Sequence, residues 1–338
     1  MEYQVKQLQP NHADHISYYK QKYLEDMFTN ESVIAQPKYD GERMLIHIDG
    51  PHIYCTSRRF SKKTGRYMEN QDKLPILEKI WKKVYDTGLN LDYTVIDCEC
   101  YSKDWSTIVG ILHSLPERAV ELQKQNAASF AVFDCLYYNG KDVREEDYAM
   151  RLGYASNVVM NFNYKPMHVV KAMKRLDALS KVWYDTELEN FSYIHSMEDW
   201  QQCMQCAIDL GFEGIVVKSL DRKYYDKGAS LKCKKFETID CVVCGYQEGR
   251  GKYTGSVGAL EIGYYDETMD KVVKISKVNC GTDEDRTFWN EHREELLNTV
   301  VEVKCQEITD RSLRHPVYLR RRDDKDYTTC TKETIFKE

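Results

Sequence analysis

Short runs of apolar and β-branched residues alternate with polar residues along the first two thirds of the chain, and turn residues separate the runs. This alternation is typical of strands that bury one face. The pairs Asp49-Gly50 and Asn139-Gly140 each predict a tight turn after such a run. The strands expected from the pattern cover residues 33–37, 44–48, 53–59, 93–100, 129–138, 211–218 and 230–236.

Two helices are predicted from apolar residues that recur every three or four positions. The first covers residues 74–88, with Gly88 as its stop, and the second opens with a capping signal at Ser196 and ends at Gly211. The middle of the chain, residues 142–209, is expected to be mainly helical. Residues 1–32 are polar, tyrosine-rich and only weakly helical, so we expect them to cover the sheet.

The pattern changes after Phe236, where short strands follow one another with glycines between them. Five or so short strands in about a hundred residues predict a small barrel such as an OB-fold. We therefore predict an α+β protein with antiparallel sheets in a first domain, residues 1–236, and an OB-fold β-barrel in a second, residues 237–338. The elements expected there are strands at 241–245, 259–265, 271–278 and 300–305 and a helix at 283–298.

Composition limits the classes of protein that fit. The chain has 338 residues, a formal net charge of -6 and 30% charged residues, with a sequence pI near 5.9 and a mean hydropathy of -0.63. No apolar run is long enough to cross a membrane, and the first ten residues do not resemble a secretory leader. We expect a soluble, intracellular, cytoplasmic protein whose nucleic-acid-binding surface, if it has one, is local.

Twelve cysteines without a secretory leader are expected to be reduced thiols. The pairs Cys203/Cys206 and Cys241/Cys244 have C-x-x-C spacing, which also occurs in zinc sites. The first pair falls in a helical pattern and the second in an apolar strand pattern, without the tight turn of a zinc knuckle. Packing in the core is therefore the favoured interpretation.

The segment from Lys38 to Arg43 joins two predicted strands and places Lys38 at the rim of the sheet, in a turn opened by Pro37 and closed by Gly41. A lysine amine acts as a nucleophile only when partial burial or cationic neighbours lower its pKa. Taken alone, the hexapeptide fits a surface lysine in a hairpin better, because lysine, aspartate and glycine are common in turns.

Lys38-Tyr39-Asp40-Gly41-Glu42-Arg43 nevertheless resembles the nucleotidyl-lysine motif of the covalent nucleotidyltransferases, namely ATP-dependent DNA ligases, RNA ligases and mRNA capping enzymes. The resemblance implies that Lys38 attacks the α-phosphate of a nucleoside triphosphate and that Arg43 helps to bind the nucleotide. Arg58 follows a serine, as does a family arginine that contacts the 5′-phosphate of a nick. The alternative for Arg58 is an exposed charge at the end of a strand.

Two further segments match the family in order. Asp97-Cys98-Glu99 resembles its D-G-E motif, with Cys98 in place of glycine, and implies that Glu99 contacts the ribose. A solvated strand face is the alternative, although the apolar run favours burial. Phe133 matches the aromatic residue of the F-D-x-L segment that stacks on the purine, although a phenylalanine in a strand is usually a core residue.

The segment from Glu213 to Lys218 matches the family's E-G-x-x-x-K motif, in which the glutamate supports a divalent metal ion. Mg²⁺, or Mn²⁺, suits this role because it binds oxygen ligands and bridges to phosphates. Lys232 and Lys234 point the same way on their strand and match the last nucleotide-binding motif, which implies that they neutralise the α-phosphate. Lysines that protect an edge strand from aggregation are the alternative.

Two segments of the second domain resemble DNA ligases in particular. Residues 251–260 resemble the opening of the ligase OB domain, and residues 314–325 resemble the C-terminal motif that orients the β- and γ-phosphates of ATP. A solvated basic surface is the alternative for the latter segment. The residues that the motif implies as nucleotide contacts are Arg314, Arg320, Arg322 and Lys325.

The resemblance extends from residue 33 to residue 325 and is closest to a minimal, two-domain ATP-dependent DNA ligase of the viral or phage type. It implies an ATP-grasp-like nucleotidyltransferase (adenylation) domain and an OB-fold domain, joined by a hinge near residues 236–240. It further implies ATP and Mg²⁺ as cofactors, nicked double-stranded DNA as the partner in replication, repair or recombination, and a monomeric state. An mRNA capping guanylyltransferase, an RNA ligase and a non-catalytic nucleic-acid-binding protein are the alternatives.

Overall fold

The computed structural model describes residues 7–86, 91, 93–162, 164–173, 193–309 and 311–336. The chain divides into two compact units, Met1–Cys233 and Lys234–Glu338. The division falls inside one strand, slightly before the boundary expected after Phe236, and the domain limits inferred from the sequence stay a prediction. No helix in the described ranges is long and apolar enough to cross a membrane.

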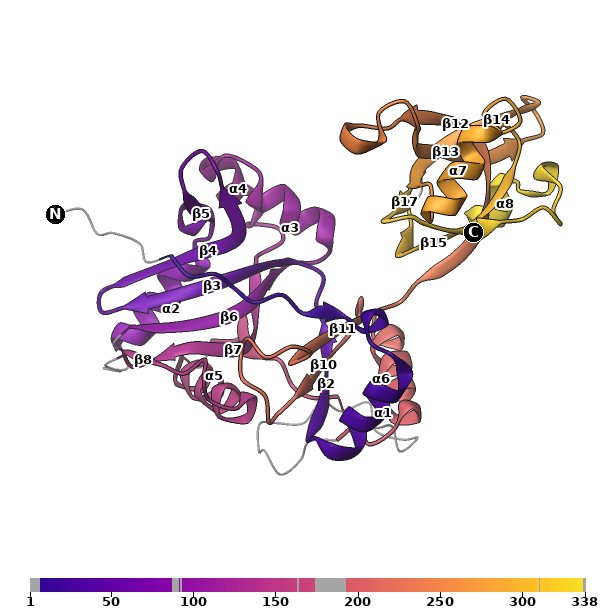
Figure 1. Ribbon diagram of the computed structural model, residues 1–338. Coiled ribbons are helices and arrows are strands. Elements are labelled where there is room, and N and C mark those ends of the chain that lie inside the picture. Colours follow the sequence, from indigo (N-terminus) through magenta and orange to yellow (C-terminus); the bar gives the residue numbers. More distant parts are fainter. Residues whose placement is uncertain are drawn as a thin grey trace. The chain divides into compact units, whose positions relative to one another are not determined.

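The larger sheet of the first unit has seven strands in the described ranges, in the order β5-β4-β3-β6-β7-β8, with β9 parallel to β7 (Figure 1). Each neighbouring pair along the β5-to-β8 path is antiparallel, as the alternating sequence pattern predicted. The strands are β3 (Glu42–Asp49), β4 (His52–Ser61), β5 (Arg66–Glu69), β6 (Thr94–Tyr101), β7 (Ser129–Tyr138), β8 (Lys141–Asp142) and β9 (Met167–Val169).

A second sheet, of four strands within the described ranges, carries the start of the Lys38 segment. Its order is β1-β11-β10-β2; β2 and β10 are antiparallel, whereas the short β1 runs parallel to β11. β2 ends at Lys38, so Pro37 lies inside the strand and not at the start of the turn. The strands are β1 (Asp14–His15), β2 (Val33–Lys38), β10 (Gly214–Ser219) and β11 (Ser230–Lys234).

Helices cover both sheets of the first unit. α1 and α6 lie beside the four-stranded sheet, and their apolar side chains share one core with β2, β10 and β11 (Figure 1). A larger core joins the seven-stranded sheet to the other helices. Ser196 caps α6 through a hydrogen bond from the Asp199 N–H, as predicted, and Gly211 follows with a φ of 83°. The helices are α1 (Gln21–Asn30), α2 (Ile76–Asp86), α3 (Trp105–Leu112), α4 (Pro116–Leu122), α5 (Tyr148–Phe162) and α6 (Met197–Asp209).

The main sheet of the second unit is antiparallel and has five strands in the described ranges, with the order β14-β13-β12-β15-β18. The first three strands form a meander, a helix separates the third from the fourth, and the fourth returns to pair with the first. This Greek-key order is that of a small OB-type barrel. The elements are β12 (Glu237–Glu248), β13 (Val257–Asp266), β14 (Lys271–Asn279), α7 (Asp283–Glu291), β15 (Val300–Cys305), β18 (Val317–Arg321) and α8 (Lys332–Ile335), with a short β16–β17 hairpin (Glu307–Ile308, Leu313–Arg314).

The structure differs from the sequence-based expectations in several details. α7 ends at Glu291, earlier than the expected Asn298, because the backbone leaves the helical conformation at His292, which has a φ of -112° and a ψ of 33°. Asn298 has a φ of 67°, and its N–H donates to the Val243 carbonyl. The strand β9 was not expected in the mainly helical middle, of which residues 174–192 lie outside the described residues. Gly88, the expected stop of α2, lies outside them too.

The cysteines of the two C-x-x-C pairs contribute to packing. Cys203 and Cys241 are buried, and Cys206 and Cys244 are half-buried. Cys203 belongs to the core beneath the four-stranded sheet, and Cys241 belongs to the core of the second unit. The expectation that these residues pack in the core is confirmed for the two buried members.

Candidate active site

Lys38 and Glu213 meet where β2 pairs with β10. Lys38 lies opposite Gly214 in the register, and the Glu213 N–H donates to the Lys38 carbonyl oxygen at 3.3 Å. The Lys38 ammonium group in turn forms an ion pair with the Glu213 carboxylate. The expected nucleophile and the expected metal ligand, 175 residues apart in the sequence, are therefore in direct contact.

Gly41 allows the turn after Lys38 to pass close to β6. A Cβ atom at this position would lie 2.2 Å from the carbonyl oxygen of Cys100, a distance that no side chain tolerates. Because Cys100 follows directly after Glu99, this contact fixes the turn beside the Glu99 strand. The glycine of the hexapeptide is thus required by a close backbone approach as well as by a turn.

Glu99 lies at the centre of the charged groups of the site. It is half-buried on β6, opposite Arg43 on β3. Burial raises the pKa of Glu99 to about 7, the charges of Lys38 and Arg43 act against that rise, and the Glu213 carboxylate reinforces it. Arg58 also acts on Glu99 from an exposed position on β4. The site therefore brings together two carboxylates and three cations from five segments of the chain.

Arg43 is held by protein groups. Its guanidinium donates to both oxygens of the fully buried Asp97, at 2.8 and 2.5 Å, and to the Tyr224 hydroxyl at 3.1 Å. Such a two-pronged, charge-assisted pair fixes the plane of the guanidinium. The same group lies over the Phe133 ring, with Cζ 5.2 Å from the ring centroid. Asp97 thus orients Arg43, and direct nucleotide binding by Arg43 stays a prediction.

Phe133, the expected purine platform, is half-buried on β7 and contacts a second cation. The Lys218 ammonium lies 4.7 Å from the centroid of its ring and donates to the Phe133 carbonyl at 3.1 Å and to the Tyr148 hydroxyl at 3.0 Å. Burial lowers the pKa of Lys218 to about 7, although the Asp134 and Asp97 carboxylates oppose the shift. Lys218 is the lysine of the E-G-x-x-x-K motif and a charged residue in an apolar strand, but no separate role was predicted for it.

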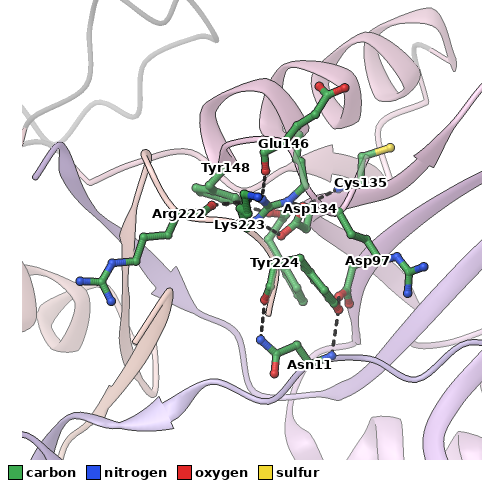
Figure 2. A network of polar contacts seen from close by, with 12 residues as sticks. Asn11, Asp97, Asp134, Cys135, Glu146, Tyr148, Arg222, Lys223 and Tyr224 are labelled. Atoms are coloured by element: carbon green, nitrogen blue, oxygen red, sulfur yellow. Dashed lines mark hydrogen bonds and ion pairs between the residues drawn. The ribbon is translucent and has the colours of Figure 1, made fainter. Parts of the chain in front are cut away.

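A buried polar network includes Asp97 and Asp134 (Figure 2). The Tyr224 hydroxyl donates to Asp97 at 2.8 Å, and the Asn11 N–H donates to the same hydroxyl at 3.0 Å. Asp134, next to Phe133 in the chain, forms a buried ion pair with Arg151 of α5 at 2.9 Å. Sequence patterns give no signal for this network, because its members lie on segments far apart in the chain.

Lys232 reaches the same region from β11. It pairs with His15 of β1 in the register, and partial burial together with the charges of Arg43, Arg58 and Lys232 lowers the pKa of His12. Lys232 and Lys234 alternate with buried residues, so they share one strand face as predicted. Lys234, the first residue of the second unit, donates to the Gln306 side chain at 3.0 Å.

The cations expected in the second unit have carboxylate partners in that unit. Asp240 of β12 receives hydrogen bonds from Arg322 at 3.2 Å and from Lys325 at 2.8 Å, and Arg322 also binds both oxygens of Asp324. Arg320 donates to Glu302 at 2.6 Å and Arg314 to Glu307 at 3.2 Å. Phosphates that bind these cations would have to compete with carboxylates already in contact with them.

Glu213, the carboxylate in contact with Lys38, has the chemistry of a magnesium ligand. The described residues contain no group of three or more potential metal ligands. Mg²⁺ commonly binds through one or two carboxylates together with substrate phosphates and waters. The donor set is therefore of the kind that holds Mg²⁺ only with its nucleotide.

Solved structures share the fold of both units. The chain is similar to "Pmar-Lig_Pre." with a TM-score of 0.69 and 18% identity, covering 93% of this chain and 67% of that chain. It is also similar to a structure titled "DNA binding with a minimal scaffold: Structure-function analysis of Lig E DNA ligases", with a TM-score of 0.62 and 17% identity, covering 94% of this chain and all of that chain. The expected fold class, an adenylation domain followed by an OB-fold, is confirmed.

The sequence profile of the family described as "ATP dependent DNA ligase domain" matches residues 15–235. The chain belongs to this family. It is 24% identical to a DNA ligase of Saccharolobus shibatae over 84% of this chain, and 27% identical to a DNA ligase of Nitrosopumilus maritimus over 80% of this chain. The chain spans less than half the length of these two relatives, 43% and 42%.

Proposed function

We propose that this chain is an ATP-dependent DNA ligase that seals nicks between a 5′-phosphate and a 3′-hydroxyl in double-stranded DNA. The observation that carries the proposal is the contact of Lys38 with Glu213 beside Glu99, inside the segment that matches the family. The proposed enzyme is a monomer in the cytoplasm, serving replication, repair or recombination.

In the first step the Lys38 ammonium group gives up a proton to solvent, and the resulting amine attacks the α-phosphorus of ATP. A nitrogen–phosphorus bond forms, the bond from the α-phosphorus to the bridging oxygen breaks, and pyrophosphate leaves. The contact between Lys38 and Glu213 must open first, because the attacking nitrogen has to turn toward the phosphate. Attack at a phosphoryl centre depends mainly on positioning and on charge neutralisation.

Other residues of the site position the nucleotide. Phe133 stacks on the purine and Glu99 contacts the ribose, while Arg43 is oriented by Asp97 next to the Phe133 ring. Lys232 and Lys234 neutralise the α-phosphate. A Mg²⁺ ion held by Glu213 would supply further charge neutralisation at the phosphates.

In the next two steps the AMP moves from Lys38 to the 5′-phosphate of a nick, and the adjacent 3′-hydroxyl then displaces it. Arg58 is exposed, and its charge acts on Glu99, which suits a contact with the 5′-phosphate. Arg314, Arg320, Arg322 and Lys325 orient the β- and γ-phosphates in the first step only. The second unit therefore has to approach ATP and then move away, with its hinge near residues 236–240.

The test is incubation of the protein with α-labelled ATP and Mg²⁺, followed by addition of a nicked duplex. We expect acid-labile label on the protein, its transfer to the DNA, and a sealed strand. A Lys38→Ala variant is the control for labelling at that residue. A wild-type protein that takes no label from ATP would contradict the proposal.

GTP in a parallel reaction decides between the proposed function and an mRNA capping guanylyltransferase. Nicked RNA in place of DNA tests the RNA ligase alternative in the same way. No contact in the described part of the chain favours either alternative, and the family match favours the DNA ligase. A non-catalytic binding protein would bind duplex DNA without forming the labelled intermediate.

A further inference from the structure

The hairpin formed by β4 and β5 carries a concentrated positive charge at an edge of the seven-stranded sheet (Figure 1). Five of the nine residues from Arg58 to Arg66 are lysine or arginine and none is acidic, in a chain whose net charge is -6. We call residues 59–68 the basic hairpin. A local basic surface on an acidic protein is the electrostatic signature of a polyanion site.

Most of this charge is available to a ligand. Lys62 and Lys63 are exposed, and neither has an ion-pair partner among the described residues. Arg59 pairs with Glu42 and Arg66 with Glu69, both at 3.0 Å; the Arg59 side chain remains exposed and the Arg66 side chain is half-buried. At least two cations can therefore bind phosphates without breaking an existing ion pair.

The loop that carries the lysines has a defined shape. The Ser61 carbonyl accepts a hydrogen bond from the Gly65 N–H at 2.8 Å, and the Ser61 hydroxyl accepts one from the Thr64 N–H at 3.3 Å. Gly65 has a φ of 66°, which suits a residue without a side chain. A preformed loop loses little conformational entropy when it binds.

Aromatic side chains accompany the charge. Phe60 and Tyr67 are paired across the two strands, with their ring centroids 5.3 Å apart. Phe60 is 55% exposed and the neighbouring Met68 is 45% exposed. Phe60 is thus an exposed aromatic side chain among lysines, which suits a nucleic-acid backbone, in which apolar sugar faces lie between the phosphates.

The basic hairpin is continuous with the site at Lys38. The register of β4 with β5 shifts between Thr56 and Phe60, and this irregular segment contains Arg58, whose charge acts on Glu99. β-Bulges often re-aim side chains beside active sites. If the 5′-phosphate of a nick binds at Arg58, the adjoining DNA therefore lies next to the basic hairpin.

We propose that the basic hairpin is a binding arm for duplex DNA beside the nick, with Lys62, Lys63 and Arg66 contacting phosphates and Phe60 packing against deoxyribose. This inference rests on the proposed function, because it takes nicked DNA as the substrate. It assigns part of the DNA affinity to a surface outside the nucleotide site.

The test compares the parent with the triple variant Lys62→Ala/Lys63→Ala/Arg66→Ala in binding to a labelled nicked duplex over a range of salt concentrations. Each phosphate contact makes the slope of log K against log salt more negative by about 0.9. Loss of three contacts should therefore make the slope shallower by up to about 2.7. The affinity at low salt should fall roughly tenfold or more. Adenylylation by ATP without DNA should be unchanged, which also shows that the variant folds.

The matched control removes three lysines from the exposed positions of α2, as Lys79→Ala/Lys82→Ala/Lys83→Ala. It changes the net charge equally and should retain the parent's affinity and slope. Phe60→Ala should weaken binding severalfold with the slope unchanged, because an apolar contact releases no counterions. These two results together support a specific arm.

Two outcomes would overturn the inference: a triple variant that binds the duplex as the parent does, or an equal loss in the α2 control, which would assign the effect to net charge. Failure of the proposed function has a different readout. In that case the parent itself takes no label from ATP, whatever the DNA affinity of the variants.

Discussion

Lys38 and Glu213 contact each other twice: the Glu213 N–H donates to the Lys38 carbonyl oxygen, and the two side chains form an ion pair. The backbone contact follows from the pairing of β2 with β10, so it is present whether or not the side chains engage. The side chains can therefore separate for catalysis while their backbones stay in register.

Replacing Lys38 should abolish the first chemical step. Lys38→Ala removes the nucleophile, and Lys38→Arg retains the charge beside Glu213 but offers a guanidinium that stays protonated and cannot attack. We expect both variants to lose labelling by α-labelled ATP by at least about a thousandfold. Both should still bind nicked DNA, and label on either variant would refute Lys38 as the nucleophile.

Glu99→Gln should alter how stability depends on pH. Burial raises the folded-state pKa of Glu99 from 4.5 to about 7, so its protonated form is favoured in the folded protein. Protonation of Glu99 therefore contributes to the free energy of unfolding in full below about pH 4.5. This contribution is lost as pH rises through 7. Compared with Glu99→Gln, the parent should lose a few degrees of Tm between pH 5 and pH 8.

An exposed glutamate of α2 provides the control for that measurement. Glu78→Gln makes the same chemical change at the surface and should leave the pH profile of the parent unaltered. Parallel profiles for the parent and Glu99→Gln from pH 5 to pH 8 would contradict a raised pKa at Glu99.

Lys218→Met should give the opposite pH dependence. Burial lowers the folded-state pKa of Lys218 from 10.5 to about 7, so the unfolded chain binds more protons between these values and the parent gains stability as pH rises from 7 to 10. The variant lacks this gain, which is at most about 1.4 kcal/mol per pH unit. Urea unfolding at pH 7 and pH 9.5 measures the difference, and equal changes in parent and variant would contradict it.

Arg320→Ala and Arg322→Ala should separate the reaction steps. Both residues are proposed to contact the pyrophosphate leaving group, so each substitution should slow adenylylation by ATP about tenfold or more. On a pre-adenylylated nick the variants should seal at close to the parent rate, whereas Glu213→Ala should remain impaired.

The size of the two arginine effects should differ. Arg322 binds Asp240 and Asp324 and is half-buried, whereas Arg320 is 61% exposed and has one carboxylate partner, Glu302. We expect the larger loss at Arg322, because its orientation is better fixed. Equal defects with ATP and with the pre-adenylylated nick, at low salt too, would exclude a role limited to the leaving group.

Local sequence was sufficient to predict the strands that carry the site. Alternation and turn residues gave β3, β4 and β6, and the capping signal at Ser196 and the stop at Gly211 placed α6 ahead of β10. These signals work because each depends on neighbours in the chain. Lys38, Glu99 and Glu213 could be chosen from many charged residues because they lie in motifs that follow the same order along the chain as in the family.

Contacts between distant segments could not be predicted in this way. Lys218 binds the Phe133 carbonyl and the Tyr148 hydroxyl, which lie on β7 and α5, so its burial depends on tertiary packing. Asn11 reaches Tyr224 across 213 residues of sequence. Asn298, the expected last residue of α7, instead donates its N–H to the Val243 carbonyl of β12, a contact that the local sequence does not show.

The carboxylates beside Arg322 and Lys325 give the second unit the character of an ion exchanger. Asp240 is tethered to β12 and cannot diffuse away when a phosphate displaces it. If these cations bind ATP as proposed, the free energy of binding is the difference between two ion pairs, and the displaced carboxylate stays at high local concentration to compete again. The Asp240 carboxylate would compete with pyrophosphate bound to these cations. Release of pyrophosphate would then not require anions from the solvent to replace it.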